Sequence, residues 1–589
     1  MPTLHWIGKE KVVNHHQQVP YRVLEHQYGF TATDGEKKGT ETGSGNKIIH
    51  GDNLEALKAL LPEYEGRINC IYIDPPYNTG NEEWKYNDNV SDPKIKKWLG
   101  QTVGKESEDL SRHDKWLCMM YPRLRLLHKL LSKEGVLVIS IGYQEVFNLM
   151  PILKEMFASK QIACITIQTS GGKPSGSFNY QHEYLLFIVP ENFEANPMKF
   201  TGGKDRTPFE GLTLATFDKT QRPNQTYPIF VDTDSNNIVG IGESLTERIK
   251  NGTYVGKPED FQYDFSEAPE GTVAIWPITS KGKECVWRLA PNRLSGDWEK
   301  GYIKVTPNRR GESLNKFSIQ YLPEGVIKKI EKGILEISGK ETNSPTLLFG
   351  DNKTVGSDIP TLWLEKDFYS VKGTTLLNEI FSGKVFNYPK PLPLITEILR
   401  AVSSDNDIIL DSFAGSASAA HATLDLNLED GGNRKFILIE MEDYAEAITA
   451  ERVKRVSKGY GDVDGTGGSF DYYTLGEPMF NEDKMLNEHI ALEKIRQYVY
   501  YTETQQPLTI GKPYQKKDNS YLLDKYNATG YYFFYEKNEM TTLNNDFLAT
   551  IKTKADQYVI YADNCLLSKE FMLKKNIVFK KIPRDITRF

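Results

Sequence analysis

The sequence predicts an α/β protein built on a doubly wound, mostly parallel sheet. Two stretches, residues 47–195 and 361–475, alternate short apolar runs with segments of helical spacing. That is the pattern of parallel strands joined by crossover helices. The residues between the two stretches are polar and rich in turns. Several apolar runs end at a carboxylate, and such sheets bind ligands at the carboxyl ends of their strands.

Length and composition limit the class of protein. A chain of 589 residues is long enough for about three to four domains. No apolar run approaches the roughly 18 residues of a membrane span, and the N-terminus lacks the basic and apolar regions of a signal peptide. The five cysteines are scattered, which favours a reducing cytoplasm and no metal site.

The net charge of −7 is unusual for a protein that binds nucleic acid, but two stretches are basic. Residues 281–310 hold eight Lys or Arg against three Asp or Glu, and residues 569–588 hold seven against two. Local patches, not the total charge, decide such binding.

The N-terminal elements come first. Residues 1–46 are polar and lack a clear period, so we expect an arm and linker. Lys47–His50 is expected to be a strand, and Gly51-Asp52-Asn53 to start the helix Leu54–Leu61. Asp52 has two interpretations, a helix N-cap or a ligand-binding carboxylate at a strand end.

The stretch that follows organises the chain. An apolar strand, Ile68–Ile73, stops at Asp74-Pro75-Pro76-Tyr77, because proline has a fixed φ and no N–H. The Asp74 carboxylate and the rigid Pro75 carbonyl can accept the hydrogens of a planar amino group while Tyr77 stacks on its heterocycle. Such a site localises the amine lone pair for attack, which is catalysis by positioning and electrostatics. The alternative is a plain Asp-Pro turn.

The rest of this half continues the alternation. Residues 81–110, with Trp84, Tyr86 and Trp98, either close over a target base or form a surface loop. The glycine-rich residues 170–182 lack the Gly-Lys-Ser/Thr of a phosphate loop and are expected to form a flexible loop. The other expected elements are a helix at 114–131 kinked at Pro122, a strand at 135–141, a helix at 145–157, and strands at 162–167 and 184–189.

Residues 196–360 are expected to form a separate domain. Helical spacing is rare there, and Lys, Arg and Asn are interleaved with aromatic residues, which suits phosphate contacts, base readout and stacking. The alternative is a solvated, irregular insert. The candidate DNA-binding residues are Lys281, Lys283, Arg288, Arg293, Arg309 and Arg310.

The second half of the sheet begins near residue 361. A helix is expected at 392–402, and a later strand runs into the small-residue loop Asp411–Ser416, which opens a helix at 419–424. Small residues at such a junction let the backbone approach a nucleotide cofactor. A strand at 435–440 ends at Glu440, which can accept both ribose hydroxyls. His421 is expected to be a helix-surface or packed residue and not a catalytic one.

Residues 476–589 are expected to form a C-terminal α/β accessory domain for contact with a partner, a subunit or DNA. An amphipathic helix is predicted over 482–500, followed by aromatic strands at 530–535 and 558–561.

Together these motifs resemble those of a known family. Asp74–Tyr77 is similar to the catalytic tetrapeptide of adenine-specific DNA amino-methyltransferases. Its extension Asn78-Thr79-Gly80 is similar to that of the modification (Mod) subunits of Type III restriction-modification systems, and Phe413–Gly415 resembles the family's cofactor motif. The catalytic motif precedes the cofactor motif, as in the beta class, and the resemblance covers about residues 45–475.

The resemblance implies a circularly permuted, Rossmann-like methyltransferase sheet, with residues 196–360 inserted as a target-recognition domain. It implies S-adenosyl-L-methionine as the cofactor. The implied catalytic residues are Asp74, Pro75, Pro76 and Tyr77, and the implied cofactor-binding residues are Asp52, Asp74, Lys390, Asp411, Phe413, Ala414, Gly415, Ser416 and Glu440.

Two positions depart from the family pattern. Ala417 replaces the second glycine of Phe-x-Gly-x-Gly, and alanine is tolerated there where φ is negative. Gly142-Tyr143-Gln144-Glu145 stands where the family carries an acidic pair, so the role of those acids is not transferred to this chain.

The expected function is methyl transfer to N6 of adenine in double-stranded DNA, with the target base flipped out of the duplex. The resemblance implies a Type III-like modification subunit in a prokaryotic cytoplasm, a homodimer, and a restriction (helicase-nuclease) partner. Two alternatives stay open: an acceptor such as N4 of cytosine or an RNA base, and a DNA-recognition subunit that has lost activity.

Overall fold

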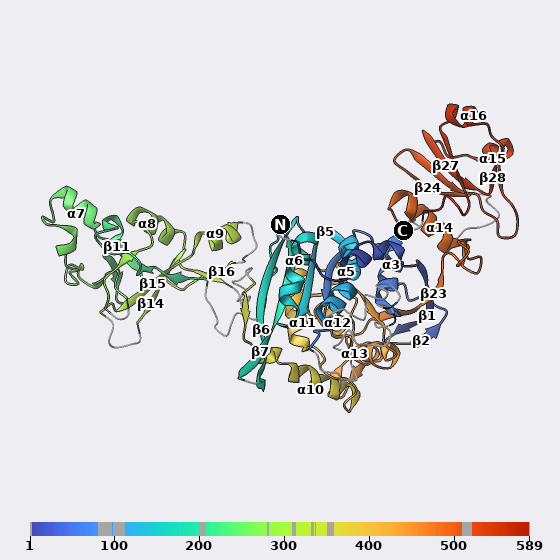
Figure 1. The fold of residues 1–589 in the computed structure, drawn as a ribbon. Helices are drawn as coiled ribbons and strands as arrows, with labels where there is room; N and C mark the ends of the chain where they lie inside the picture. Colours follow the sequence, from blue (N-terminus) through green and yellow to red (C-terminus); the bar gives the residue numbers. More distant parts are fainter. Residues whose placement is uncertain are drawn as a thin grey trace. The chain divides into compact units, whose positions relative to one another are not determined.

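The computed structural model describes residues 3–79, 97, 100, 112–175, 177–199, 208–279, 282–308, 314–331, 335, 337–349, 359–508 and 521–587. The chain forms two compact units, one made of Met1–Met198 with Asp358–Phe589 and the other of Lys199–Ser357 (Figure 1). The stretch with Trp84, Tyr86 and Trp98 lies outside the described residues.

An 11-stranded sheet forms the centre of the first unit. In spatial order its strands are β18 (Leu362–Trp363), β6 (Lys160–Ser175), β7 (Phe178–Pro190), β5 (Leu131–Ile141), β4 (Ile68–Ile73), β19 (Ile408–Asp411), β20 (Lys435–Glu440), β3 (Lys47–His50), β23 (Ser469–Pro478), β1 (Arg22–Thr31) and β2 (Gly35–Lys38). The six strands from β5 to β23 run parallel, whereas β7 and β1 are antiparallel to their neighbours. The mostly parallel, doubly wound sheet predicted from the sequence is confirmed.

The two halves of the chain interleave in this sheet. β19 and β20, from the second half, lie between β4 and β3, from the first half. The register pairs Ile409 with Cys70 on one side and Ile439 with Ile49 on the other. Strand ends that are far apart in the sequence therefore become neighbours at one edge of the sheet.

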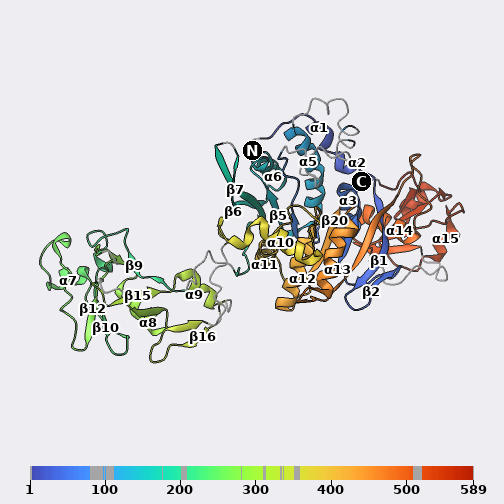
Figure 2. The same ribbon diagram turned by 90° about the horizontal axis from the view of Figure 1, so that it is seen from below.

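Helices cover both faces of the sheet (Figure 2). One face carries α1 (Lys9–Val12), α2 (His15–Gln18), α3 (Asn53–Tyr64), α5 (Arg112–Leu130) and α6 (Val146–Met156), and the other carries α10 (Ser370–Phe381), α11 (Leu392–Val402), α12 (Ser418–Asp430) and α13 (Glu451–Lys458). Buried side chains such as Leu57, Ile71 and Leu137 form the core under the first group. No helix within the described ranges is long and apolar enough to span a membrane.

Residues 1–46 differ from the expected arm. Arg22–Thr31 forms β1, which pairs with β23 and so belongs to the central sheet. Tyr28 stacks on Tyr472 with ring centroids 5.1 Å apart. Glu25 and Gln27 of β1 are exposed, and the polar residues among its first six concealed the strand in the sequence.

The glycine-rich residues 170–182 also differ from expectation, because they belong to a long antiparallel hairpin. β6 and β7 pair from Lys160 opposite Pro190 to Ser175 opposite Phe178, with an irregularity between Gln168 and Lys173. Glycines at such a bulge accommodate the irregular backbone.

The residues after β23 form a smaller α/β region in the same unit. Its elements are α14 (Leu492–Thr504), β24 (Leu522–Tyr526), β25 (Thr529–Phe533), β26 (Thr542–Leu543), α15 (Asn545–Thr550), β27 (Gln557–Ala562), β28 (Asn564–Cys565), α16 (Lys569–Lys574) and β29 (Ile577–Lys581). The helix predicted over 482–500 begins only at Leu492. Before it the chain turns back, with Lys484 at a φ of +71° and Phe480 bridged to Leu486.

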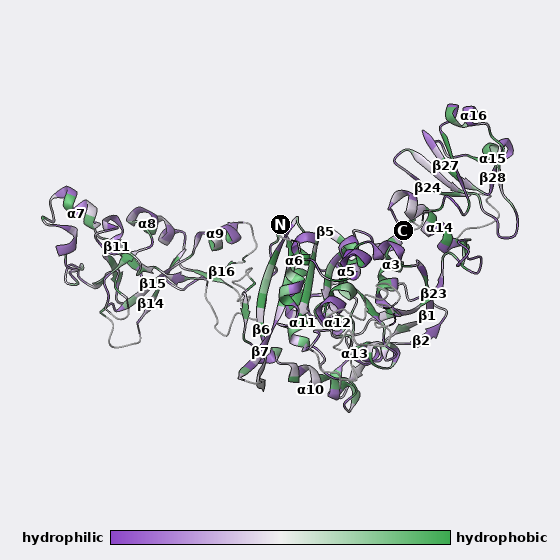
Figure 3. Ribbon diagram, in the orientation of Figure 1, coloured by the Kyte–Doolittle hydropathy of each residue, from purple (hydrophilic) through white to green (hydrophobic). Residues whose placement is uncertain are grey.

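The second unit is built of short antiparallel strands. Its elements are β8 (Glu210–Gly211), β9 (Thr213–Leu214), β10 (Ile229–Asp232), β11 (Ile238–Ile241), α7 (Leu245–Asn251), β12 (Thr272–Ile275), β13 (Val286–Trp287), α8 (Pro291–Glu299), β14 (Ile303–Pro307), β15 (Phe317–Tyr321), α9 (Glu324–Glu331), β16 (Ile337–Lys340) and β17 (Leu347–Phe349). The cluster with Tyr227, Trp287 and Leu294 is the largest core of this unit, and smaller cores bury Leu245 of α7 and Ile327 of α9. Figure 3 shows mostly hydrophilic residues on α8, in contrast to the hydrophobic strand β5 of the central sheet.

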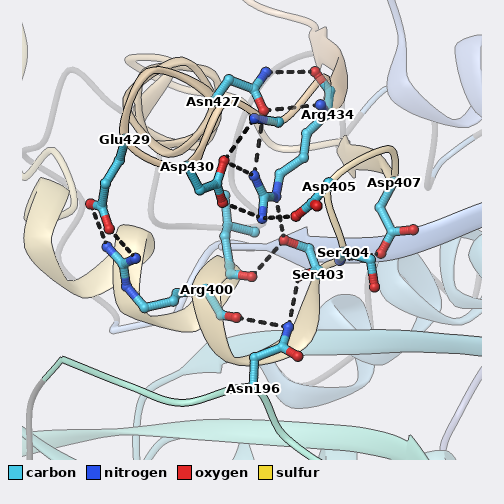
Figure 4. Close-up of polar contacts among 12 residues, drawn as sticks. Asn196, Arg400, Ser403, Ser404, Asp405, Asp407, Asn427, Glu429, Asp430 and Arg434 are labelled. Carbon is cyan, nitrogen blue, oxygen red and sulfur yellow. Dashed lines mark hydrogen bonds and ion pairs between the residues drawn. The ribbon is translucent and has the colours of Figure 1, made fainter. Parts of the chain in front are cut away.

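A polar cluster secures the first unit where the chain leaves for the second (Figure 4). The buried Arg434 donates to the Ser403 hydroxyl at 3.0 Å and pairs with Asp430 at 2.8 Å. The amide of Asn196 donates to the carbonyls of Arg400 and Ser403 at 3.1 and 2.8 Å. The last residues before the second unit are thereby fixed to the C-terminal end of α11.

Candidate active site

Four carboxylates lie at neighbouring strand ends of the central sheet. Asp74 follows β4, Asp411 ends β19, Glu440 ends β20, and Asp52 comes shortly after β3. The four strands are adjacent in that order and parallel. Their carboxyl ends therefore meet at one edge, where a sheet of this kind binds ligands.

The turn after β4 is held from two sides. Nε1 of the buried Trp116, on α5, donates to the Pro76 carbonyl at 2.6 Å. Asn78 has a φ of +58°, a conformation that Asn tolerates better than most residues. Its side-chain amide donates to the buried carboxylate of Glu145. These contacts hold the turn Asp74–Asn78 in place at the end of β4.

Lys390 and Glu183 complete a polar network around Asp74 and Tyr77. Nζ of Lys390 lies 3.2 Å from Oδ1 of Asp74 and 2.8 Å from Oε2 of Glu183. The Tyr77 hydroxyl donates to the same Glu183 oxygen at 2.8 Å and accepts from Lys390 Nζ at 2.6 Å. Lys390 Nζ also lies 4.6 Å from the centre of the Tyr77 ring, a cation–π distance. The ammonium thus contacts Asp74, one of the two predicted acceptors of the amino hydrogens, and Tyr77, which is predicted to stack on the heterocycle.

Burial and charge oppose each other in this network. Burial favours a lower pKa for Lys390, but Asp74 and Glu183 outweigh it and hold the pKa above its ordinary value. Burial favours a higher pKa for Glu183, but the Lys390 ammonium holds that pKa below its ordinary value. Lys390 and Glu183 are therefore an ion pair at neutral pH.

The loop after β19 is shaped by backbone bonds to carboxylates. Oδ1 of Asp411 accepts from the Phe413 N–H at 3.0 Å, and Oε2 of Glu440 accepts from the Gly415 N–H at 2.7 Å. Gly415 has a φ of +51°, and a Cβ there would lie 3.4 Å from the Phe386 ring. A glycine therefore allows the tight turn that the small-residue pattern predicted.

Ala417 has a φ of +63°, so the negative φ at which alanine would be tolerated is not the one that this residue adopts. A left-handed conformation costs an L-residue about 1–2 kcal/mol, and the surrounding structure must enforce it. The buried Arg452, on α13, does so by donating to the Ser416 carbonyl at 3.0 Å and to the Ser418 hydroxyl at 2.9 Å. His421 is buried beside Arg452 at 3.2 Å, in agreement with a packed residue.

Asp52 caps helix α3. Its Oδ1 accepts from the N–H groups of Leu54 and Glu55 at 2.9 and 3.1 Å, and its Oδ2 lies 3.8 Å from the buried Arg123. Capping uses Oδ1 and the ion pair with Arg123 uses Oδ2, so a ligand-binding role for Asp52 remains a prediction.

This edge suits a cationic ligand with hydroxyl groups. Burial raises the pKa of Asp411 well above its ordinary value, and Asp74 and Glu440 add to the rise. Burial also raises the pKa of Glu440 to about 7, against the two backbone N–H groups that it accepts. The Ser412 hydroxyl is buried without a hydrogen-bond partner in the part of the chain that the structure describes. A ligand with a positive charge would reduce the repulsion between these carboxylates, and ligand hydroxyls would form hydrogen bonds with the buried polar atoms. S-adenosyl-L-methionine has both features, so these residues fit it.

The predicted DNA-binding residues lie in the second unit where they are described. Lys283, Arg288 and Arg293 are exposed, and Arg293 lies 3.4 Å from Asp297 on α8. Lys281, Arg309 and Arg310 lie outside the described residues.

Sequence reasoning missed Glu183, Trp116 and Arg452. Glu183 is 106 residues away from Tyr77 and reaches it only through the antiparallel placement of β7. The available signal was a charged residue directly before the apolar run 184–189, which was predicted as a strand and forms the second half of β7. A buried charge of that kind needs a partner, but the sequence does not show which partner it has.

Comparisons with known proteins identify the family of the chain. A family model described as DNA methylase matches residues 68–451. The Type III restriction-modification enzyme EcoPI Mod subunit of Escherichia phage P1 is 24% identical over 466 residues, which is 75% of this chain and 64% of that protein. The Type II methyltransferase M.KpnI of Klebsiella pneumoniae is 26% identical over 430 residues, 70% of this chain and 84% of that protein.

A third relative, the Type III restriction-modification enzyme StyLTI Mod subunit of Salmonella typhimurium, is 27% identical over 430 residues. The similarity covers 72% of this chain and 55% of that protein. The matched part of the chain thus spans less than two thirds of the length of either of these two Mod subunits.

Proposed function

Because this chain belongs to the DNA methylase family, we propose that it transfers a methyl group from S-adenosyl-L-methionine to N6 of adenine at a specific site in double-stranded DNA. The observation that carries the proposal is the position of Asp74. Its strand lies beside the strand that leads into the loop Asp411–Ser416, so an amine acceptor and a cofactor loop share one sheet edge. The Asp-Pro-Pro-Tyr form of the turn supports adenine as the base.

When bound, S-adenosyl-L-methionine supplies an electrophilic methyl group on a sulfonium. The chain would hold it with Asp52, Asp74, Lys390, Glu440 and the loop Asp411–Ser416. Each Glu440 oxygen accepts one backbone N–H, from Gly415 and Glu442, and a carboxylate oxygen has a second lone pair for a ribose hydroxyl.

The target adenine would enter beside the turn. Its amino group lies inside the duplex, so the base has to flip out before it can react. Tyr77 would stack on the base while the Asp74 carboxylate and the Pro75 carbonyl accept its amino hydrogens and aim its lone pair.

Lys390 has to release Asp74 for this to happen, because its ammonium contacts Asp74 and the Tyr77 ring. Glu183 lies 2.8 Å from the same Nζ and remains as its partner, so no buried charge is left alone. Lys390 and Glu183 are therefore positioning residues, which keep Asp74 occupied until the base arrives.

Target recognition is assigned to residues 196–360, whose exposed Lys283 and Arg288 suit contacts to the DNA backbone or to base edges. The similarity to the EcoPI and StyLTI Mod subunits supports a Type III-like modification subunit. In that role the protein would form a homodimer and work with a restriction (helicase-nuclease) subunit, and residues 476–589 would be an accessory domain for such contacts.

The test is base-modification sequencing of plasmid DNA from cells that express either the wild-type protein or Asp74→Asn. We expect N6-methyladenine in one short motif on a single strand with the wild type, and none with the near-isosteric variant. N4-methylcytosine would identify a different acceptor. Unmodified DNA from cells that contain folded wild-type protein would reject the proposal.

A further inference from the structure

Three aromatic side chains form an exposed cluster beside the catalytic turn. Tyr143, Phe178 and Tyr180 are 39%, 70% and 38% exposed. The rings of Tyr143 and Tyr180 are nearly parallel, with centroids 4.2 Å apart and planes at 8°. Phe178 lies next to them, with its centroid 6.5 Å from that of Tyr180. We call these three residues the aromatic platform.

The platform comes from two elements at the catalytic edge. Tyr143 lies just beyond β5, whose last residue, Ile141, pairs with Tyr184 of β7. Phe178 and Tyr180 precede Tyr184 on the antiparallel β7, so they lie where the β6–β7 hairpin runs past the end of β5. The hairpin is a long strand pair in Figure 1.

The platform is also connected to Tyr77. A Cβ placed on Gly142 would lie 3.1 Å from the Tyr77 ring, so the backbone just before Tyr143 packs against the catalytic tyrosine. Glu183, which accepts from the Tyr77 hydroxyl, is three residues after Tyr180 on the same strand, so the two side chains leave β7 on opposite faces. One short stretch of structure therefore carries the ring that is proposed to receive the target adenine and a second, exposed set of rings.

Core packing does not account for this exposure. Phe178 leaves most of its surface in solvent, and clustered exposed aromatics on a soluble protein mark interaction sites. Flat, stacked rings match the faces of nucleobases, and stacking on an aromatic side chain contributes about 1–3 kcal/mol per base.

We propose that the aromatic platform stacks on a nucleobase of the DNA that flanks the target adenine and becomes unstacked when that adenine leaves the helix. The inference rests on the proposed function, since it needs DNA with a flipped base at Tyr77. It adds a base-binding surface that is separate from the target pocket and independent of sequence readout by residues 196–360.

The experiment measures, by fluorescence anisotropy without cofactor, the affinity of the protein for an unmethylated duplex. The duplex contains the motif found by base-modification sequencing. Phe178→Ala and Tyr180→Ala should weaken binding between about 5-fold and 100-fold, whereas Tyr180→Phe should bind like the wild type. Leu428→Ala, an exposed apolar residue on α12, is the matched control and should have no effect. Thermal melting confirms that each variant is folded.

A second series separates base stacking from a structural role. Each base beside the target is replaced in turn by an abasic nucleotide. At one position, loss of the base should weaken binding of the wild type. The same loss should not weaken binding of Phe178→Ala further, because the missing base and the substitution remove the same contact. Additive losses at every position, or variants that bind like the wild type, would overturn the proposal.

Two controls identify other failures. Methylation of the same duplex by the wild type is measured first. If the duplex is not methylated, both the proposed function and the role of the aromatic platform are rejected. If it is methylated and the platform variants bind DNA like the wild type, only the role of the aromatic platform is rejected. Light scattering tests a different occupant: if Phe178→Ala lowers the oligomeric state, the platform is a contact between copies of the chain and the DNA assignment is wrong.

Discussion

Replacing Glu183 by Gln tests how the site keeps Asp74 ready for an amino group. The change preserves the shape of the side chain and removes its charge. Glu183 accepts from Lys390 Nζ and from the Tyr77 hydroxyl, each at 2.8 Å. In the variant, Asp74 is the remaining charged partner of Lys390 in this network, so the ammonium stays on Asp74 more firmly and competes with the target amine.

The size of the effect follows from these contacts. A hydrogen bond to a charged group contributes about 1.5–3 kcal/mol and a neutral one about 0.5–1.5 kcal/mol, so the change shifts the balance by about 1–2 kcal/mol. The side chains of Glu183 and Lys390 are 24% and 15% exposed, so solvent screens the pair only in part. At about 1.4 kcal/mol per factor of ten, kcat/KM for DNA should fall by about 5-fold to 30-fold.

The assay is transfer of a labelled methyl group to plasmid DNA under single-turnover and steady-state conditions, with cofactor binding measured by calorimetry. Cofactor affinity should change little, because Glu183 is placed on the acceptor side of the site. Glu191→Gln, an exposed residue just after β7, is the matched control and should behave like the wild type. A folded Glu183→Gln variant with unchanged kcat/KM would refute the reasoning that Lys390 competes with the base.

Three further predictions follow from the same site. Glu440 accepts hydroxyl groups best when it is ionised, and its pKa is raised to about 7. Cofactor affinity, measured by calorimetry, should therefore fall as the pH drops from about 8 to about 6. Glu440→Gln should remove the part of this pH dependence that comes from Glu440. Ala417→Gly relieves about 1–2 kcal/mol of left-handed strain but loses about 0.8 kcal/mol of methyl burial and about 0.4–1 kcal/mol through the unfolded chain. Urea denaturation should therefore show a free energy of unfolding within about 1 kcal/mol of the wild type. Trp116→Phe removes the N–H that donates to the Pro76 carbonyl. It should lower the free energy of unfolding by about 1–3 kcal/mol in the same assay and also lower methyl transfer. Wild-type activity in this variant would show that the contact is not needed to hold the turn.

The sequence located elements whose ends are marked by a change from apolar to polar or special residues. β4 ends at two prolines and β20 at Glu440, and both strands have the predicted bounds. β1 was missed because a strand near a sheet edge needs few apolar residues, and its aromatic partners Tyr472 and Phe470 lie far along the chain. The start of α14 was placed too early because Leu486 and Ile490 fit helical spacing, although a turn before the helix buries them.

The site shows the same division between local and distant information. The order of motifs predicted that Asp74 and Asp411 would share a sheet edge, since parallel strands present their ends together. No local pattern could show that Glu183 lies on Lys390, or that Arg452 holds Ala417 at a positive φ, because both depend on pairs far apart in the sequence. The roles of these residues in binding and catalysis remain predictions for the variants above.

The central claim is that the chain methylates adenine at N6 through Asp74, and product analysis tests it most directly. Purified protein is incubated with plasmid DNA and S-adenosyl-L-methionine, the DNA is digested to nucleosides, and the methylated nucleosides are identified by mass spectrometry. We expect N6-methyladenine from the wild type and none from Asp74→Asn. Methylated adenine from a folded Asp74→Asn variant, or N4-methylcytosine as the wild-type product, would contradict it.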